Sequence, residues 1–259
     1  HVVGLAAVSL VCLFRKEGGP ARGIPPLLWG GGVVGVGTVF ASIGAFSGLG
    51  ASLAVALALL GQIVFSVIVD ALGLFGRKRY PPRLRTLPGI ALALAGIGVM
   101  AGRLEGKLGY ALAALAAGAL PVLSFTLNSQ LATRIGTWRS ARANYITGLA
   151  TTLLVLAVLR PPLAANFETL KTMGILYIAG GGLMGVLMVA VSNLVYPRLP
   201  ALTATLLIFS GQALAGILVD ALSAGAFEPP KLAGTALVLL GLGINALLER
   251  RATRRGPGL

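Results

Sequence analysis

Charged residues, cysteine and histidine are all scarce in this sequence. Of its 259 residues only 11% are charged, seven of them Asp or Glu, and there is one cysteine and one histidine. A soluble domain carries charge on about a quarter of its residues, so a fold surrounded by water is excluded. The single cysteine, Cys12, excludes an internal disulfide and a cysteine-based zinc site. No two acids share a metal-binding motif, and we therefore predict no metal, no cofactor and no enzymatic activity.

Long apolar runs take the place of the missing charge. Hydrophobic residues make up 56% of the chain, and the mean hydropathy is +0.91. The runs are rich in Gly and Ala and show no alternation of period 2, which favours membrane helices over a membrane barrel. At about 20 residues per span, we predict an all-α polytopic membrane protein with spans near residues 25–47, 49–72, 86–102, 107–130, 141–160, 172–195, 199–222 and 231–248.

An internal repeat is visible in the motif Gly-Gln-x7-Asp. Its two copies lie 150 residues apart (211 − 61) and occupy Gly61, Gln62 and Asp70, then Gly211, Gln212 and Asp220. Residues 29–72 match residues 179–222 without a gap at 17 of 44 positions, including a shared Gly-Gly-Gly-x-x-Gly. Residues 87–98 match residues 232–243 at 7 of 12 positions, with an offset of 145 (232 − 87). The chain is therefore expected to contain the same unit twice.

The number of helices per unit predicts how the units are oriented. Two helices precede the glycine-rich helix of the second unit, whereas only residues 1–14 precede that of the first. We interpret residues 1–14 as the tail of an incomplete helix, and His1 as a cut end or scar rather than a ligand. This gives two five-helix repeats over residues 1–106 and 107–259, with about nine helices present. Because five is odd, the repeats are expected to be inverted, as in many secondary transporters.

The distribution of positive charge gives an independent view of the topology. If the spans alternate, 16 of the 21 Lys and Arg residues fall on one side and five on the other. By the positive-inside rule the richer side is cytoplasmic, and the C-terminus lies there. The net charge of +14 then comes from loops that face an anionic leaflet, so we expect a lipid bilayer as partner and no nucleic acid.

These motifs resemble the YdcZ-like family of the drug/metabolite transporter superfamily. The resemblance rests on the order of Gly-Gly-Gly-x-x-Gly, Gly-Gln-x7-Asp and a glycine-spaced helix, found twice, as in a tandem fusion. It implies five-helix units, a bacterial inner-membrane location and export of a small molecule. The family's first helix carries Gln and Asn near its middle; the second repeat has Asn128 and Gln130 at that place, and the first repeat lacks that helix.

Polar residues within the apolar runs are the candidate functional residues. Gln62 and Gln212 fall near mid-span, where a buried amide either lines a pathway or ties helices together. Ser66 and Asp70 continue from Gln62 at intervals of four residues, so they share one side of a helix. An acid within a membrane is a candidate for proton coupling or cation binding. For Asp70 and Asp220, anchoring a helix end or pairing with a loop arginine such as Arg77 is the alternative.

Two further groups of residues have a functional and a structural interpretation. Pro121 interrupts the span that carries Asn128 and Gln130, and broken helices often border transporter sites, although proline also serves for shape alone. The glycine pairs with four-residue spacing predict close helix packing rather than phosphate binding; they are Gly31 with Gly35 and Gly181 with Gly185.

Taken together, these features predict an inverted-repeat transporter that exports small metabolites or drugs by alternating access, with proton coupling as an option. The alternative is a membrane subunit or assembly partner that transports nothing. A transporter should gather polar groups along a water-accessible pathway, whereas a scaffold should bury Gln62 and Gln212 in dry contacts. The substrate is not indicated, and a homodimer is left open.

Overall fold

The computed structural model describes residues 1–15, 19, 22–49, 51–80, 106–161, 174–208 and 211. The chain divides into two compact units, residues 1–202 and 203–259. Residues 203–208 and 211 of the second unit are helical. All contacts discussed below lie within the first unit. The predicted spans 86–102 and 231–248, most of 199–222, and the candidates Gln212 and Asp220 lie outside the described residues.

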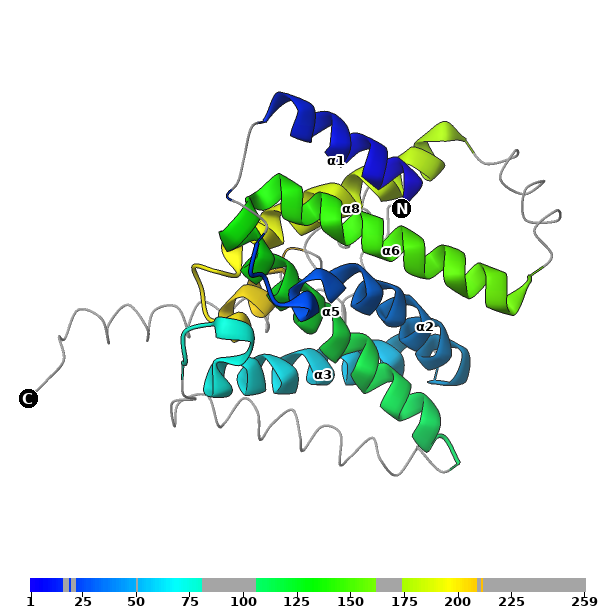
Figure 1. Cartoon of the computed structure of the whole chain (residues 1–259). Coiled ribbons are helices and arrows are strands. Elements are labelled where there is room, and N and C mark those ends of the chain that lie inside the picture. Colours follow the sequence, from blue (N-terminus) through cyan, green and yellow to red (C-terminus); the bar gives the residue numbers. More distant parts are fainter. Residues whose placement is uncertain are drawn as a thin grey trace, which may run out of the picture. The chain divides into compact units, whose positions relative to one another are not determined.

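Every regular element in the described part is helical (Figure 1). The α-helices are α1 (Val2–Phe14), α2 (Gly31–Leu49), α3 (Ala51–Leu72), α5 (Leu108–Ile135), α6 (Thr137–Leu159) and α8 (Ile175–Val195), with short 3₁₀ turns η1 (Pro26–Gly30) and η2 (Leu74–Gly76). Within the described residues, four segments are long and apolar enough to cross a membrane: Pro26–Leu49, Leu53–Leu72, Leu108–Ile135 and Thr137–Leu159. The prediction of a helical membrane protein is confirmed.

Two predicted helix boundaries are wrong in the same place. The apolar runs predict one span that ends near residue 130 and a second that begins near residue 141. The structure continues α5 to Ile135 and begins α6 at Thr137, so only Gly136 separates them, with a φ of 93°. A positive φ favours glycine, which explains why the chain reverses there. α5 also remains helical through Pro121.

Helix α5 is the central element of the first unit (Figure 1). It contacts α2, α3, α6 and α8. Large apolar side chains on the outer faces of the surrounding helices are exposed, among them Phe40 and Ile43 of α2 and Leu154 and Val158 of α6. An apolar exterior around a small-residue interior is what a protein dissolved in lipid requires, since packing rather than hydrophobicity drives helix association there.

The directions of the helices follow from which residues meet. Helix α2 is antiparallel to α5, since Gly31 lies against Asn128 and Gly48 lies against the Tyr110 ring. Helix α6 is also antiparallel to α5, because of the tight reversal at Gly136. Helix α8 is antiparallel to α6: the Tyr145 hydroxyl donates to the Gly182 carbonyl at 3.4 Å, and the Asn193 amide donates to that of Thr137 at 3.1 Å. Thus α2 and α8, which carry the two copies of the glycine motif, run in opposite directions.

Most of the described positive charge gathers at one end of the first unit, here called the basic end. The end of α3 meets the segment after α8 there, and Arg139 of α6 donates to the Gly19 carbonyl at 3.2 Å. At the opposite end, the end of α2 meets the beginning of α5. The basic end carries Arg77, Lys78, Arg79, Arg134, Arg139 and Arg198. This clustering agrees with the charge asymmetry of the loops.

Candidate functional site

The candidate site begins where α3 ends. Gly73 adopts a left-handed conformation with a φ of 62°, as glycine commonly does just after a helix. The chain then folds back on the helix, so that the Tyr80 N–H donates to the Asp70 carbonyl at 2.7 Å and the Arg79 Nε donates to that of Leu72 at 3.2 Å. This local reversal brings the buried Arg77 next to the buried Asp70.

The carboxylate of Asp70 caps the helix that begins at residue 201. Its Oδ1 accepts the Ala201 N–H at 2.6 Å and its Oδ2 accepts the Leu202 N–H at 2.9 Å. The first N–H groups of a helix have no partner within the helix, and this end carries partial positive charge. A carboxylate from another helix satisfies both needs at once, through hydrogen bonds strengthened by its charge.

The guanidinium of Arg77 binds the end of the preceding helix. Its Nη1 donates to the Tyr196 carbonyl at 2.7 Å and its Nη2 donates to that of Leu199 at 2.8 Å, while the Tyr196 ring lies 5.7 Å from the guanidinium carbon. Burial lowers the pKa of Arg77, and the nearby Asp70 opposes that shift. Arginine remains charged nonetheless. A positive group on these carbonyls complements the negative end of α8.

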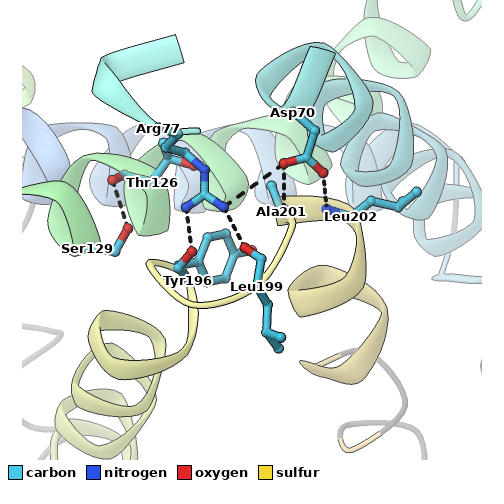
Figure 2. Close-up of polar contacts among 8 residues, drawn as sticks. All are labelled: Asp70, Arg77, Thr126, Ser129, Tyr196, Leu199, Ala201 and Leu202. Carbon is cyan, nitrogen blue, oxygen red and sulfur yellow. Dashed lines mark hydrogen bonds and ion pairs between the residues drawn. The ribbon is translucent and has the colours of Figure 1, made fainter. Parts of the chain in front are cut away.

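Together these contacts form what we call the Asp70–Arg77 clamp, which holds residues 196–202 (Figure 2). The ion pair itself is the weakest contact, because Nη2 and Oδ1 are 4.0 Å apart. The four hydrogen bonds to the backbone are all 2.9 Å or shorter. Each side chain therefore interacts chiefly with a helix end rather than with the other side chain. Within the described part, the buried Arg77 Nε has no partner.

Gln62 and Ser66, which precede Asp70 on α3 at intervals of four residues, lie farther from the basic end. Ser66 is fully buried and Gln62 is half-buried. The Gln62 backbone lies against Gly118 of α5. Its side-chain amide makes no hydrogen bond to any residue that the structure describes. Gln62, Ser66 and Asp70 thus lead along α3 toward the clamp.

The side chain of Asn128 takes part in contacts between helices. It is 1% exposed, and its amide donates to Asn144 Oδ1 at 2.8 Å and to Ser124 Oγ at 3.4 Å. Ser124 in turn donates to the Gly31 carbonyl at 2.9 Å, and Ser140 donates to the Asn128 carbonyl at 2.6 Å. This network ties α5 to both α2 and α6. Its members are satisfied by the protein, as buried polar groups in a membrane require.

Gln130 lies elsewhere on α5 and is half-buried. Its Oε1 is the nearest group to the Cβ position of Gly76, in the turn that carries Arg77. The structure therefore places Asn128 at the contact with α2 and Gln130 beside the clamp turn. The two residues, neighbours in the sequence-based hypothesis, have different surroundings.

The predicted packing glycines divide into two groups. A Cβ at Gly31 would collide with the Asn128 amide, and one at Gly185 would lie 2.5 Å from the Tyr145 hydroxyl oxygen. Gly35 and Gly181 instead have open space at their Cβ positions among the described residues. Among the described residues, one member of each pair thus contacts a neighbouring helix closely.

Three closer approaches were missed by sequence reasoning. Gly32 of α2 lies against the backbone of Gly148 in α6, and Gly182 of α8 lies against that of Gly4 in α1. The sequence held a signal for this, because Gly-Leu-Ala occurs at both 4–6 and 148–150. In the third contact, Gly61 of the repeated motif meets the Leu115 carbonyl, and Gly118 meets that of Ala58. The glycine of Gly-Gln-x7-Asp is thus a packing residue.

Comparison with protein families decides the assignment. The family described as "Putative inner membrane exporter, YdcZ" matches residues 1–99 and 109–244 of the chain. The chain belongs to this family. Searches of curated proteins and of solved structures gave no match. Membership of the YdcZ family makes the chain a membrane transporter in general terms, which agrees with the apolar helices of the fold.

Proposed function

We propose that this YdcZ-family chain exports small metabolites or drugs across the bacterial inner membrane by alternating access between two inverted repeats. The observation that carries the proposal is a pair of reciprocal glycine contacts. Gly32, in the third helix of the first proposed repeat, meets the second helix of the second repeat at Gly148. Gly182, the counterpart of Gly32, meets the second helix of the first repeat at Gly4.

An exchange of this kind is expected when two copies of one unit are related by a two-fold axis in the membrane plane. The opposite directions of α2 and α8 support the same relation, since these helices carry the matching glycine motifs. Inverted repeats can open alternately to the two sides, because each repeat presents to one side what its partner presents to the other. On this basis the basic end is cytoplasmic, and the C-terminus lies on that side.

The polar residues of α3 supply the other part of the proposal. Gln62 is half-buried without a hydrogen-bond partner in the described part of the chain. A scaffold subunit would be expected to tie such an amide into a dry contact, as Asn128 is tied. With no partner among the described residues, the Gln62 amide supports a transport pathway over a purely structural role. Ser66 and Gln130 are assigned to the same pathway, and Asp70 and Asp220 to proton coupling.

Transport by the purified chain in proteoliposomes under an imposed pH gradient tests this proposal. Ethidium serves as a cationic probe and carboxyfluorescein as an anionic one. At least one probe should move faster than in liposomes that hold the Gln62→Leu variant. Asp70→Asn and Asp220→Asn test coupling separately, since an unchanged proton dependence in both would contradict the coupling role.

The inverted arrangement has its own test, which does not depend on a substrate. Single cysteines at Lys78 and Arg160, in a Cys12→Ser background, should react with an impermeant thiol reagent from opposite sides of the membrane. Reaction of both positions from the same side would overturn the inverted topology.

A further inference from the structure

We propose that the Asp70–Arg77 clamp is the gate that closes the transport pathway at the basic end. The inference rests on the proposed function, because a gate requires a pathway. It assigns two named side chains and one short segment, residues 196–202, to the opening step.

The position of the clamp is the first argument. Gln62, Ser66 and Asp70 follow one another along α3, and residues 196–202 lie over the last of them through the hydrogen bonds to Ala201 and Leu202. Asp70 is 4% exposed and Arg77 is 8% exposed. Residues 196–202 therefore cover the end of this polar series that lies nearest the basic end, which is where a gate would stand.

The kind of contact also suits a part that opens. The clamp residues Asp70 and Arg77 belong to the first proposed repeat, and residues 196–202 belong to the second. Movement of one repeat relative to the other must therefore break or form the contact. Four charge-assisted hydrogen bonds to backbone can be exchanged for water, with no cavity to fill. The signs also matter: the anion binds N–H groups and the cation binds carbonyl groups, so exchanging the two charges would place each against the wrong helix end.

Accessibility of a cysteine beneath the clamp tests the gate without a transport substrate. The sole native cysteine is replaced by serine, Ser66→Cys is introduced, and its reaction with an impermeant thiol reagent is measured in inside-out vesicles. Asp70→Ala or Arg77→Ala should raise the reaction rate roughly tenfold, because charge-assisted hydrogen bonds are lost. The double exchange Asp70→Arg with Arg77→Asp should not restore the slow rate.

A backbone variant keeps the test independent of buried charge. Ala201→Pro removes the N–H group that donates a hydrogen bond to Asp70, and proline is tolerated at the first position of a helix. The matched control is Leu108→Pro, at the first position of α5 and away from the clamp. Ala201→Pro should raise the rate at Ser66→Cys, and Leu108→Pro should leave it unchanged.

Three results would overturn the gate. They are an unchanged rate in Ala201→Pro, an equal increase in Leu108→Pro, and recovery of the slow rate by the charge exchange, which would indicate a simple ion pair. Transport of a probe combined with any of these results would reject the gate but retain the proposed function. Faster labelling in chains that move neither probe would support the gate while challenging the export proposal.

Discussion

The two kinds of contact between the proposed repeats differ in what they can tolerate. At the glycine contacts, Gly32 with Gly148 and Gly61 with α5, helix backbones touch directly. At the clamp, Asp70 and Arg77 reach across to helix ends through hydrogen bonds. A close-packed backbone contact cannot shift without a steric cost, whereas a hydrogen bond to a helix end can be replaced by water. The glycine contacts thus suit a pivot, and the clamp suits a part that opens.

The largest effect is expected at the crossing of α3 and α5. Gly118→Ala would push a methyl group into the Ala58 carbonyl and the Gln62 backbone, where nothing flexible can yield. Overpacking of this kind costs about 1–3 kcal/mol. The measurement is thermal unfolding in detergent. Gly35→Ala is the matched control, because its Cβ position is open and alanine should stabilise the helix by up to about 1 kcal/mol. Destabilisation by both variants to the same extent would contradict the crossing.

A comparison of Gly32→Ala with Gly182→Ala tests how alike the reciprocal contacts are. A Cβ at Gly32 would meet backbone atoms of α6, but one at Gly182 would first meet the Val3 side chain at 2.8 Å. A side chain can move aside more easily than a backbone. Gly32→Ala should therefore lower the unfolding temperature more than Gly182→Ala does. The reverse order would argue against a tight backbone contact at Gly32.

The polar network of α5 should affect stability more than the candidate pathway does. Asn128→Leu removes the hydrogen bonds to Asn144 and Ser124, with an expected loss of roughly 1–2 kcal/mol. Gln130→Leu is the control, because this half-buried side chain has no hydrogen-bond partner in the described part of α5 and its surroundings. Equal losses in the two variants would mean that Gln130 is also structural.

The smallest change in stability is expected for Gln62→Leu. The Gln62 amide forms no hydrogen bond with described residues, and leucine is of similar size and favours helices, so the unfolding temperature should change little. Transport should fall if Gln62 lines the pathway. A large drop in unfolding temperature with normal transport of a probe would reassign Gln62 to packing.

Much of the fold could be predicted from the sequence because lipid imposes a simple pattern. Apolar length predicted the existence and order of α2, α3, α5, α6 and α8. The α5–α6 boundary failed because helices extend beyond the apolar region into the basic end. Apolarity does not record that extension, and Gly136 alone marks the reversal.

The site was less predictable, because its contacts join residues that are distant in sequence. The sequence suggests Arg77 only as an alternative partner for Asp70, and no side chain of residues 196–202 takes part in the four hydrogen bonds of the clamp. Their backbone groups make the contact, and composition cannot show which helix end a carboxylate will reach. Spacing shows that two glycines share a face, but the neighbouring helix determines which of them it contacts, and among the described residues these are Gly31 and Gly185.

The distance between the two sides of the clamp shows most directly whether the clamp opens. Spin labels at Lys78 and Arg198, both exposed at the basic end, report that distance by double electron–electron resonance in a Cys12→Ser background. Labels at Ala6 and Met184, exposed on α1 and α8, provide the reference pair across a glycine contact. If the clamp opens and closes, the first pair should show two populations, with Ala201→Pro favouring the longer distance, and the reference pair one unchanged population. A single, unshifted distance at the clamp, or equal movement of both pairs, would contradict opening at the clamp.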